Sequence, residues 1–238
     1  MLRSLLTAAI TSAVILAAAR PLVAQDASDS AAYRALTQTP PGALPMQMDV
    51  SITGLRDRGG VTVRYGIMSY DDREYVHDFG VALTIPTGSS SIAITGGYYW
   101  PNCNGRCTGH AMFGASFSQN LVRLSLGSGV GSGSLNIGSG WELGYAKVDE
   151  TTLASGRLSI PISLVPARRS TTVIPYVAPG VGGGLVHDST GSEVGLLFTL
   201  GAGIGVRTSH GFTAHAGISR AFLSTGNWLA GVGITIGT

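Results

Sequence analysis

The segment Val194-Gly-Leu-Leu-Phe-Thr-Leu-Gly-Ala-Gly-Ile-Gly-Val206 decides the fold of this chain, because its residue types alternate. Every second residue from Val194 to Val206 is apolar, and most of the positions between them hold glycine or threonine. A repeat of two is the repeat of a β-strand whose two faces meet different surroundings, whereas a helix repeats every 3.6 residues. The segment therefore predicts a strand with one apolar face and one face of small residues.

The same alternation recurs along most of the chain. It predicts ten strands, at residues 61–67, 79–85, 92–100, 111–117, 122–126, 158–164, 173–185, 194–206, 212–218 and 228–236. We interpret them as an all-β fold, an antiparallel up-and-down transmembrane β-barrel of ten strands. Eight or twelve strands result if the segments at 48–55, 111–117 or 141–148 are misassigned.

The expected connections alternate in length. If the N-terminus is periplasmic, the outer connections are residues 71–76, 101–109, 131–153, 187–193 and 223–227, and the periplasmic turns are residues 87–90, 119–120, 165–172 and 209–210. The second set is on the whole shorter. Long outer loops with short periplasmic turns are typical of outer-membrane barrels, and an even strand number returns the C-terminus to the periplasm.

Composition separates this prediction from a soluble barrel or sandwich. Charged residues make up 12% of the chain, 35 residues are glycine, and beyond the N-terminus no apolar run approaches the roughly 18 residues of a spanning helix. A soluble barrel would carry Lys, Glu, Thr and Gln on its water-facing side. Here the second face is mostly Gly, Ala, Ser and Thr, which favours a narrow lumen inside a membrane barrel.

The N-terminus predicts export. Arg3 precedes an apolar run from Leu5 to Ala19, and Val23-Ala-Gln25 offers a cleavage site, so residues 1–25 are a predicted signal peptide and the outer membrane the predicted location. Residues 26–60 are a predicted periplasmic leader, partly disordered, before a barrel domain at 61–238. Of the 15 Lys and Arg residues, Arg3 and Arg20 belong to the signal peptide, so the mature chain has 13 basic and 13 acidic residues and no formal net charge. A neutral chain without a basic run does not indicate nucleic-acid binding.

Two short segments hold residues with other chemistry. Cys103 and Cys107 flank the turn dipeptide Asn104-Gly105, and in an oxidising envelope they favour a disulfide over a metal site. Residues 71–74, with Asp78, form a predicted acidic outer loop. A solvated loop is its simpler interpretation, and divalent cations that bridge lipopolysaccharide are the alternative.

Four polar residues are candidates for the lumen, because the alternation places them on the face of small residues: Arg64, Arg123, Arg207 and His215. Glu142 and Glu193, expected near strand ends, are possible partners of the arginines, which favours structural ion pairs over a substrate path. His215 and Ser219 lie four residues apart on one strand, about 13 Å, so they do not form a nucleophile–base pair. Arg220 falls on the apolar face, where its side chain can extend to lipid head groups.

A family resemblance supports this interpretation. The signal ending in Ala-Gln and the segments at 174–184 (IPYVAPGVGGG) and 200–206 (LGAGIGV) resemble those of the small outer-membrane β-barrel domain proteins of Gram-negative bacteria. The resemblance covers roughly residues 61–237 and rests on pattern, without a catalytic motif. It implies a shared architecture, diverse roles, and insertion by the barrel-assembly machinery.

The sequence thus predicts a non-enzymatic outer-membrane barrel with a structural, surface-interaction or narrow-pore role. Its predicted partners are outer-membrane lipid and lipopolysaccharide, and no cofactor or metal is expected. A barrel enzyme acting on outer-leaflet lipid, with His215 as its base, is one alternative. A soluble periplasmic ligand-binding β-barrel is the other.

Overall fold

A computed structural model of the chain describes residues 59–71, 74–101, 110–127, 132–148, 150–167, 171–189, 191–221 and 228–237. Those ranges hold eleven strands: β1 (Gly60–Asp71), β2 (Glu74–Thr87), β3 (Ser90–Pro101), β4 (His110–Leu126), β5 (Gly133–Val148), β6 (Thr151–Ser159), β7 (Ile162–Pro166), β8 (Thr171–Asp188), β9 (Gly191–Thr208), β10 (Phe212–Ala221) and β11 (Trp228–Gly237). No helix long and apolar enough to span a membrane occurs among the described residues. The predicted signal peptide, nearly all of the predicted leader, and Cys103 and Cys107 lie outside them.

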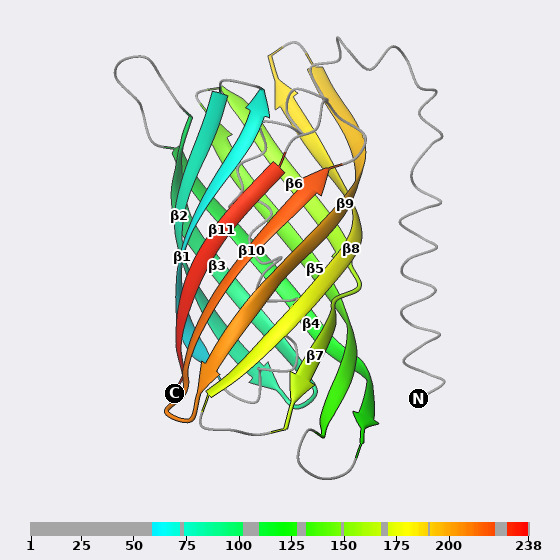
Figure 1. Cartoon of the computed structure of the whole chain (residues 1–238). Coiled ribbons are helices and arrows are strands. Elements are labelled where there is room, and N and C mark those ends of the chain that lie inside the picture. Colours follow the sequence, from blue (N-terminus) through cyan, green and yellow to red (C-terminus); the bar gives the residue numbers. More distant parts are fainter. Residues whose placement is uncertain are drawn as a thin grey trace. The chain divides into compact units, whose positions relative to one another are not determined.

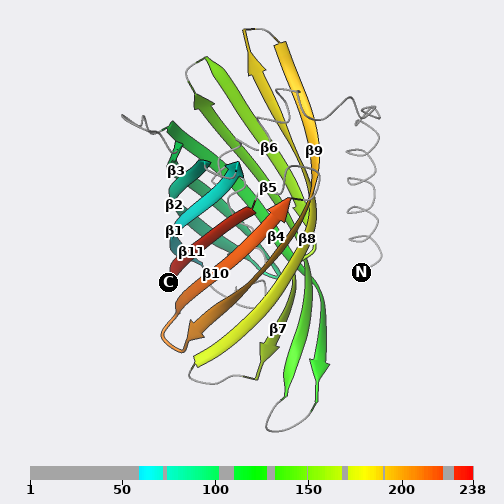
Figure 2. The same cartoon turned by 45° about the horizontal axis from the view of Figure 1, so that its top comes forward.

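Antiparallel pairing joins the strands into one closed sheet (Figures 1 and 2). Apart from β6 and β7, which both lie between β5 and β8, each strand pairs with its neighbour along the chain, and β1 returns to β11 with a register from Gly60–Gly237 to Ser69–Trp228. β4 pairs with β5 over nearly its whole length, which completes the circle. A closed barrel leaves no unpaired edge, so the backbone polar groups of every strand find partners within the sheet.

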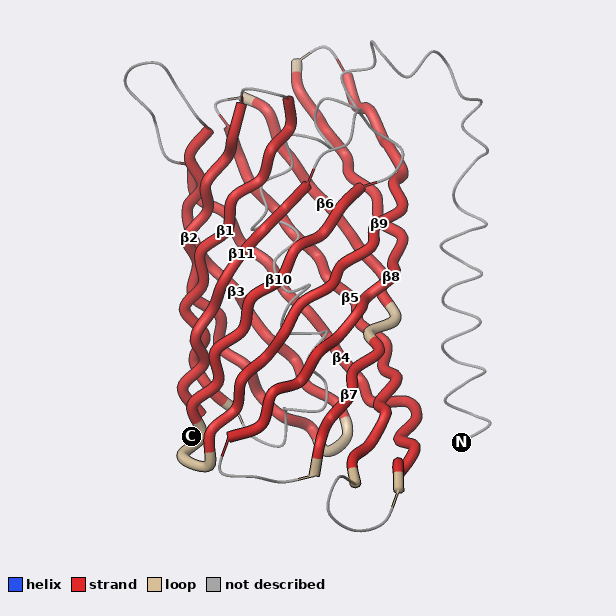
Figure 3. The backbone as a smooth tube through the Cα atoms, in the orientation of Figure 1, coloured by secondary structure: helices blue, strands red, loops and turns tan. Residues whose placement is uncertain are grey.

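β6 and β7 act as one strand interrupted at Ile160 and Pro161. Both pair with β5 on one side and with β8 on the other. Proline has no amide hydrogen to give to the ladder, yet the chain stays in place, because the Pro161 carbonyl accepts from Gly138 N at 2.9 Å. The interruption is the short tan segment partway along the wall in Figure 3. The barrel therefore has ten strand positions, and the predicted fold class is confirmed.

Two of the ten predicted strands were wrong. The segments 111–117 and 122–126 belong to the single strand β4, and the turn expected at Gln119–Asn120 lies inside it. A register shift between Asn120 and Val122 moves the outward side chains from odd to even positions, and this change of phase mimics a turn. The outer loop expected at residues 131–153 is also wrong, because it contains all of β5.

The barrel has two rims. Gly60, Phe212 and Gly237 mark the terminal rim, where Gly237 N donates to Gly211 O at 2.9 Å. Strands at this rim are joined through residues 88–89, 127–132, 167–170 and 209–211. Strands at the opposite, distal rim are joined through residues 72–73, 102–109, 149–150, 189–190 and 222–227. Because several strands run further than expected, the predicted contrast in length between the two sets of connections is absent.

The two faces of the wall are the reverse of those in a water-soluble protein. Large apolar side chains point outward, and Leu143 and Ile236 are each 65% exposed, whereas inward-facing Thr62 and Glu142 are 1% exposed. Apolar inward side chains gather near the distal rim at Met112, Ala146 and Leu153, which are cross-strand neighbours on β4, β5 and β6. A water-soluble protein would hide the apolar face, so this wall suits an apolar solvent.

Gly96 and Gly97 on β3 test this division between the two faces. A Cβ atom at Gly97 would lie 2.7 Å from Met112 Cε and 2.8 Å from Gly80 Cα, whereas one at Gly96 would meet no heavy atom within 4 Å. We expect Gly97→Val to destabilise the barrel by about 1–3 kcal/mol through overpacking. Gly96→Val should be neutral or slightly stabilising. Urea titration in detergent micelles, followed by tryptophan fluorescence, measures both, and equal losses would contradict the assigned faces.

Candidate functional site

The interior of the barrel is lined with polar side chains. Buried hydroxyl, amide and charged groups come from most strands, and they include two ion pairs, a histidine and many serines and threonines. Hydroxyl pairs join neighbouring strands toward the terminal rim: Ser91 Oγ lies 2.7 Å from Ser118 Oγ, and Thr62 Oγ1 lies 2.8 Å from Thr235 Oγ1. We refer to this inner surface as the lumen.

The first ion pair joins β1 to β2. Arg64 Nη2 lies 3.9 Å from Asp78 Oδ2, and the two side chains are 6% and 4% exposed. Glycines make room for both, since a Cβ at Gly80 would lie 2.8 Å from Arg64 Nε and one at Gly66 would collide with the Asp78 carboxylate. Gly80 and Gly66 are the direct cross-strand neighbours of Arg64 and Asp78. Burial of both charges makes each depend on the other.

The second ion pair joins β5 to β6. Arg157 Nη1 lies 3.9 Å from Glu142 Oε2, with side chains 1% and 0% exposed, and the residues are direct cross-strand neighbours. Arg157 Nη2 also donates to the Ala178 carbonyl on β8 at 3.5 Å. A Cβ at Gly180, also on β8, would lie 3.1 Å from Arg157 Nε. The guanidinium therefore spans three neighbouring strands, β5, β6 and β8.

His215 and Tyr176 also lie against glycines. A Cβ at Gly233 would collide with the His215 ring, and one at Gly203 would collide with the Tyr176 hydroxyl. His215 is 5% exposed and Tyr176 is 4% exposed. Because Gly233 is also the cross-strand neighbour of Arg64, large side chains and glycines alternate around this part of the wall.

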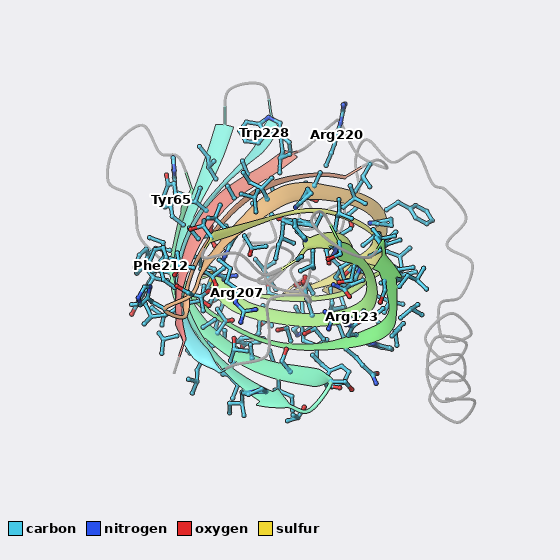
Figure 4. The ribbon with its side chains drawn as sticks, turned by 60° about the horizontal axis from the view of Figure 1, so that its bottom comes forward. Tyr65, Arg123, Arg207, Phe212, Arg220 and Trp228 are labelled. Carbon is cyan, nitrogen blue, oxygen red and sulfur yellow. The ribbon has the colours of Figure 1, made fainter. Side chains whose placement is uncertain are left out.

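The predicted lumen residues occupy different environments. Arg64 and His215 are buried in the lumen, whereas Arg207 is half-buried near the terminal rim and Arg123 is exposed on the part of β4 beyond the register shift. Figure 4 shows Arg123 and Arg207 within the ring of strands, and Tyr65, Phe212 and Arg220 outside it. The four residues are thus not brought together into one site.

Sequence analysis missed three of the four ion-pair residues as lumen groups. Asp78 was expected in an acidic outer loop, but it lies buried within β2, on the same face as Gly80 and Ala82. Glu142 was expected near a strand end, but it lies within β5, and its partner Arg157 was not considered. Strict alternation could have placed both residues in the lumen. Arg157 lies two residues before Ser159, and Asp78 lies two residues before Gly80, so each shares a strand face with a small residue.

The described residues also bear on the metal-site and enzyme hypotheses. No group of three or more His, Cys, Asp or Glu side chains in metal-binding proximity occurs within the described part of the chain. His215 and Ser219 are both buried on the lumen face of β10, at positions four apart. The side chain of Glu193 lies outside the described set.

An apolar outer face, a closed antiparallel wall and a lumen of paired charges define a transmembrane β-barrel of the outer-membrane type. No protein-family model matches the chain, and no curated protein matches it. Some solved structures are similar to the chain at low TM-scores.

Three of these solved structures are outer-membrane proteins or their barrel domains. The beta domain of the Bordetella autotransporter BrkA is 15% identical with a TM-score of 0.41, and the match covers 76% of this chain and 100% of that domain. The translocator domain of NalP from Neisseria meningitidis is 13% identical with a TM-score of 0.41, covering 86% and 97%. The attachment protein Ail of Yersinia pestis is 12% identical with a TM-score of 0.30, covering 75% and 97%. These similarities concern the fold alone.

The Arg64–Asp78 pair generates a stability prediction. Arg64→Met leaves the Asp78 carboxylate buried without its cation, and we expect a loss of about 3–5 kcal/mol in the free energy of unfolding. Arg207→Met removes another inward arginine outside the two ion pairs, and we expect it to cost about 1 kcal/mol or less. Urea unfolding in micelles compares the two variants. Similar losses of unfolding free energy in both variants would show that the Arg64–Asp78 pair stabilises the barrel no more than a single inward arginine does.

Proposed function

We propose that this protein is a structural outer-membrane barrel that holds its distal connections at the cell surface and has a lumen closed to steady solute flow. The observation that carries the proposal is the pair of buried ion pairs in the lumen wall. The predicted signal peptide and the apolar outer face support the membrane location. With the termini on the periplasmic side, the distal rim faces the exterior.

The two ion pairs occupy separate parts of the wall. Arg64 and Asp78 project from β1 and β2, and Glu142 and Arg157 project from β5 and β6. β3 and β4 lie between them in one direction around the barrel, and β8 to β11 lie between them in the other. In a water-filled pore such charges would be hydrated, but here all four side chains are at most 6% exposed. Packed lumen charges favour a closed barrel over a pore.

The position of His215 supports a non-enzymatic role. β10 runs from Phe212 at the terminal rim to Ala221 at the distal rim, so His215 lies in the half nearer the terminal rim. A base acting on outer-leaflet lipid would have to work from the distal half of the wall. The other alternative, a soluble ligand-binding barrel, would place the large outward side chains in water, including Ile94 at 60% exposure.

Two measurements test the proposal. Expressed with its signal in a Gram-negative host, the protein should fractionate with the outer membrane and migrate differently on gels with and without boiling. In planar bilayers the purified barrel should give no steady single-channel current.

A lumen variant provides the positive control for conductance. Replacement of Arg64, Asp78, Glu142 and Arg157 together by alanine removes both ion pairs, and we expect channel openings if the folded variant retains its heat-dependent gel shift. Arg220→Gln, on the outer face, should leave the bilayer silent. A steady ohmic current from the unaltered barrel would overturn the closed-lumen proposal, and recovery from the soluble periplasm would overturn the membrane location.

A further inference from the structure

One outward surface, between the middle of the wall and the distal rim, combines aromatic rings and a cation. It consists of Tyr65, His77, Tyr98, Arg220 and Trp228, which we call the aromatic–basic patch. These residues come from five strands that are consecutive around the wall, β3, β2, β1, β11 and β10. Most of the remaining outward positions on these strands are aliphatic, so the patch interrupts an otherwise apolar face.

Tyr65 and His77 form one half of the patch. The Tyr65 hydroxyl lies 2.7 Å from His77 Nδ1, and the two rings stack with centroids 6.1 Å apart and an interplanar angle of 29°. When the hydroxyl donates to Nδ1 of a neutral ring, Nε2 carries the ring proton and is a donor. Phe79 joins this half to Tyr98, because it is the cross-strand neighbour of both Tyr65 and Tyr98.

Arg220 and Trp228 form the other half. They are direct cross-strand neighbours, Arg220 one residue before the end of β10 and Trp228 the first residue of β11. Figure 4 shows the Arg220 side chain pointing away from the barrel. An arginine beside a tryptophan at the end of an apolar wall lies where lipid head groups begin, since tryptophan and tyrosine concentrate at that level.

Charged side chains on the described outer face of the strands are all basic. The outward cations among the described strand side chains are Arg220 and Lys147, and Lys147 lies one residue before the distal end of β5. The described carboxylates of the strands, Asp78 and Glu142, both point into the lumen. The patch therefore offers N–H and O–H donors and positive charge, and the lipid-facing strand surface described around it carries no acidic group.

We infer that the aromatic–basic patch binds the phosphate group of an anionic lipid in the leaflet at the distal rim. Arg220 supplies the charged, fork-shaped donor that suits a phosphate, and Trp228 lies directly beside it on the neighbouring strand β11. Ile218, which is 55% exposed and lies two residues from Arg220 on the same face, contacts the acyl chains below. The inference rests on the proposed membrane location and adds a ligand class to it.

Quenching by a brominated lipid tests the inference locally. In a Trp100→Phe, Trp141→Phe background, Trp228 is the remaining tryptophan, since the chain has three. The barrel is reconstituted into phosphatidylcholine vesicles that contain brominated phosphatidic acid, with brominated phosphatidylcholine as the reference lipid. We expect phosphatidic acid to associate beside Trp228 about fivefold more strongly than phosphatidylcholine, the effect of one cation near an anionic surface.

Two arginine variants decide the outcome. Arg220→Gln should lower the preference to about one, whereas Arg207→Gln, which removes the same charge from the lumen face, should retain it. Equal quenching by the two lipids in the parent barrel, or an unchanged preference in Arg220→Gln, would overturn the lipid site. If the inserted barrel keeps its heat-dependent gel shift, these results leave the proposed function intact. Failure to insert into vesicles would instead overturn both.

Discussion

The antiparallel pairing of β1 with β11 leaves the sheet without an edge, and the other features of the molecule depend on that closure. A bilayer offers no water to backbone N–H and C=O groups, so a wall of strands that spans it must satisfy all of them internally. Closure then separates two faces that no longer meet. Outward side chains are selected for lipid and become aliphatic or aromatic, while inward side chains, many of them polar, must fill a narrow space.

Filling that space explains several glycines of the lumen wall. Arg64, Asp78, His215 and Tyr176 each lie against a glycine of the next strand, where a Cβ would collide with or crowd the side chain. A narrow lumen holds large polar groups only where a neighbouring strand yields volume. Charged groups placed there need partners because their hydration is lost, which accounts for the Arg64–Asp78 and Arg157–Glu142 pairs.

Two opposite mistakes in the sequence-based strand assignment compensated for each other. Splitting β4 at Asn120 added a strand, and missing β5 removed one, so the total of ten and the direction of every strand from β8 onward were still correct. The first mistake came from the shift between Asn120 and Val122, where the backbone keeps pairing while the side-chain phase changes. The second came from the Gly and Ser residues at 133–134 and 138–140, which resemble a flexible connection and hid the alternation of Leu135, Ile137, Trp141, Leu143 and Tyr145 along β5.

The sequence by itself determined the class of fold and most of the two faces, since an alternating repeat is a local property of a strand. It placed Arg64 and His215 on the inner face for the same reason. Only the tertiary structure decided which charges meet, because Glu142 and Arg157 become neighbours through strand register, which sequence spacing leaves open. Closure also gathered the aromatic–basic patch from five strands that span residues 65 to 228.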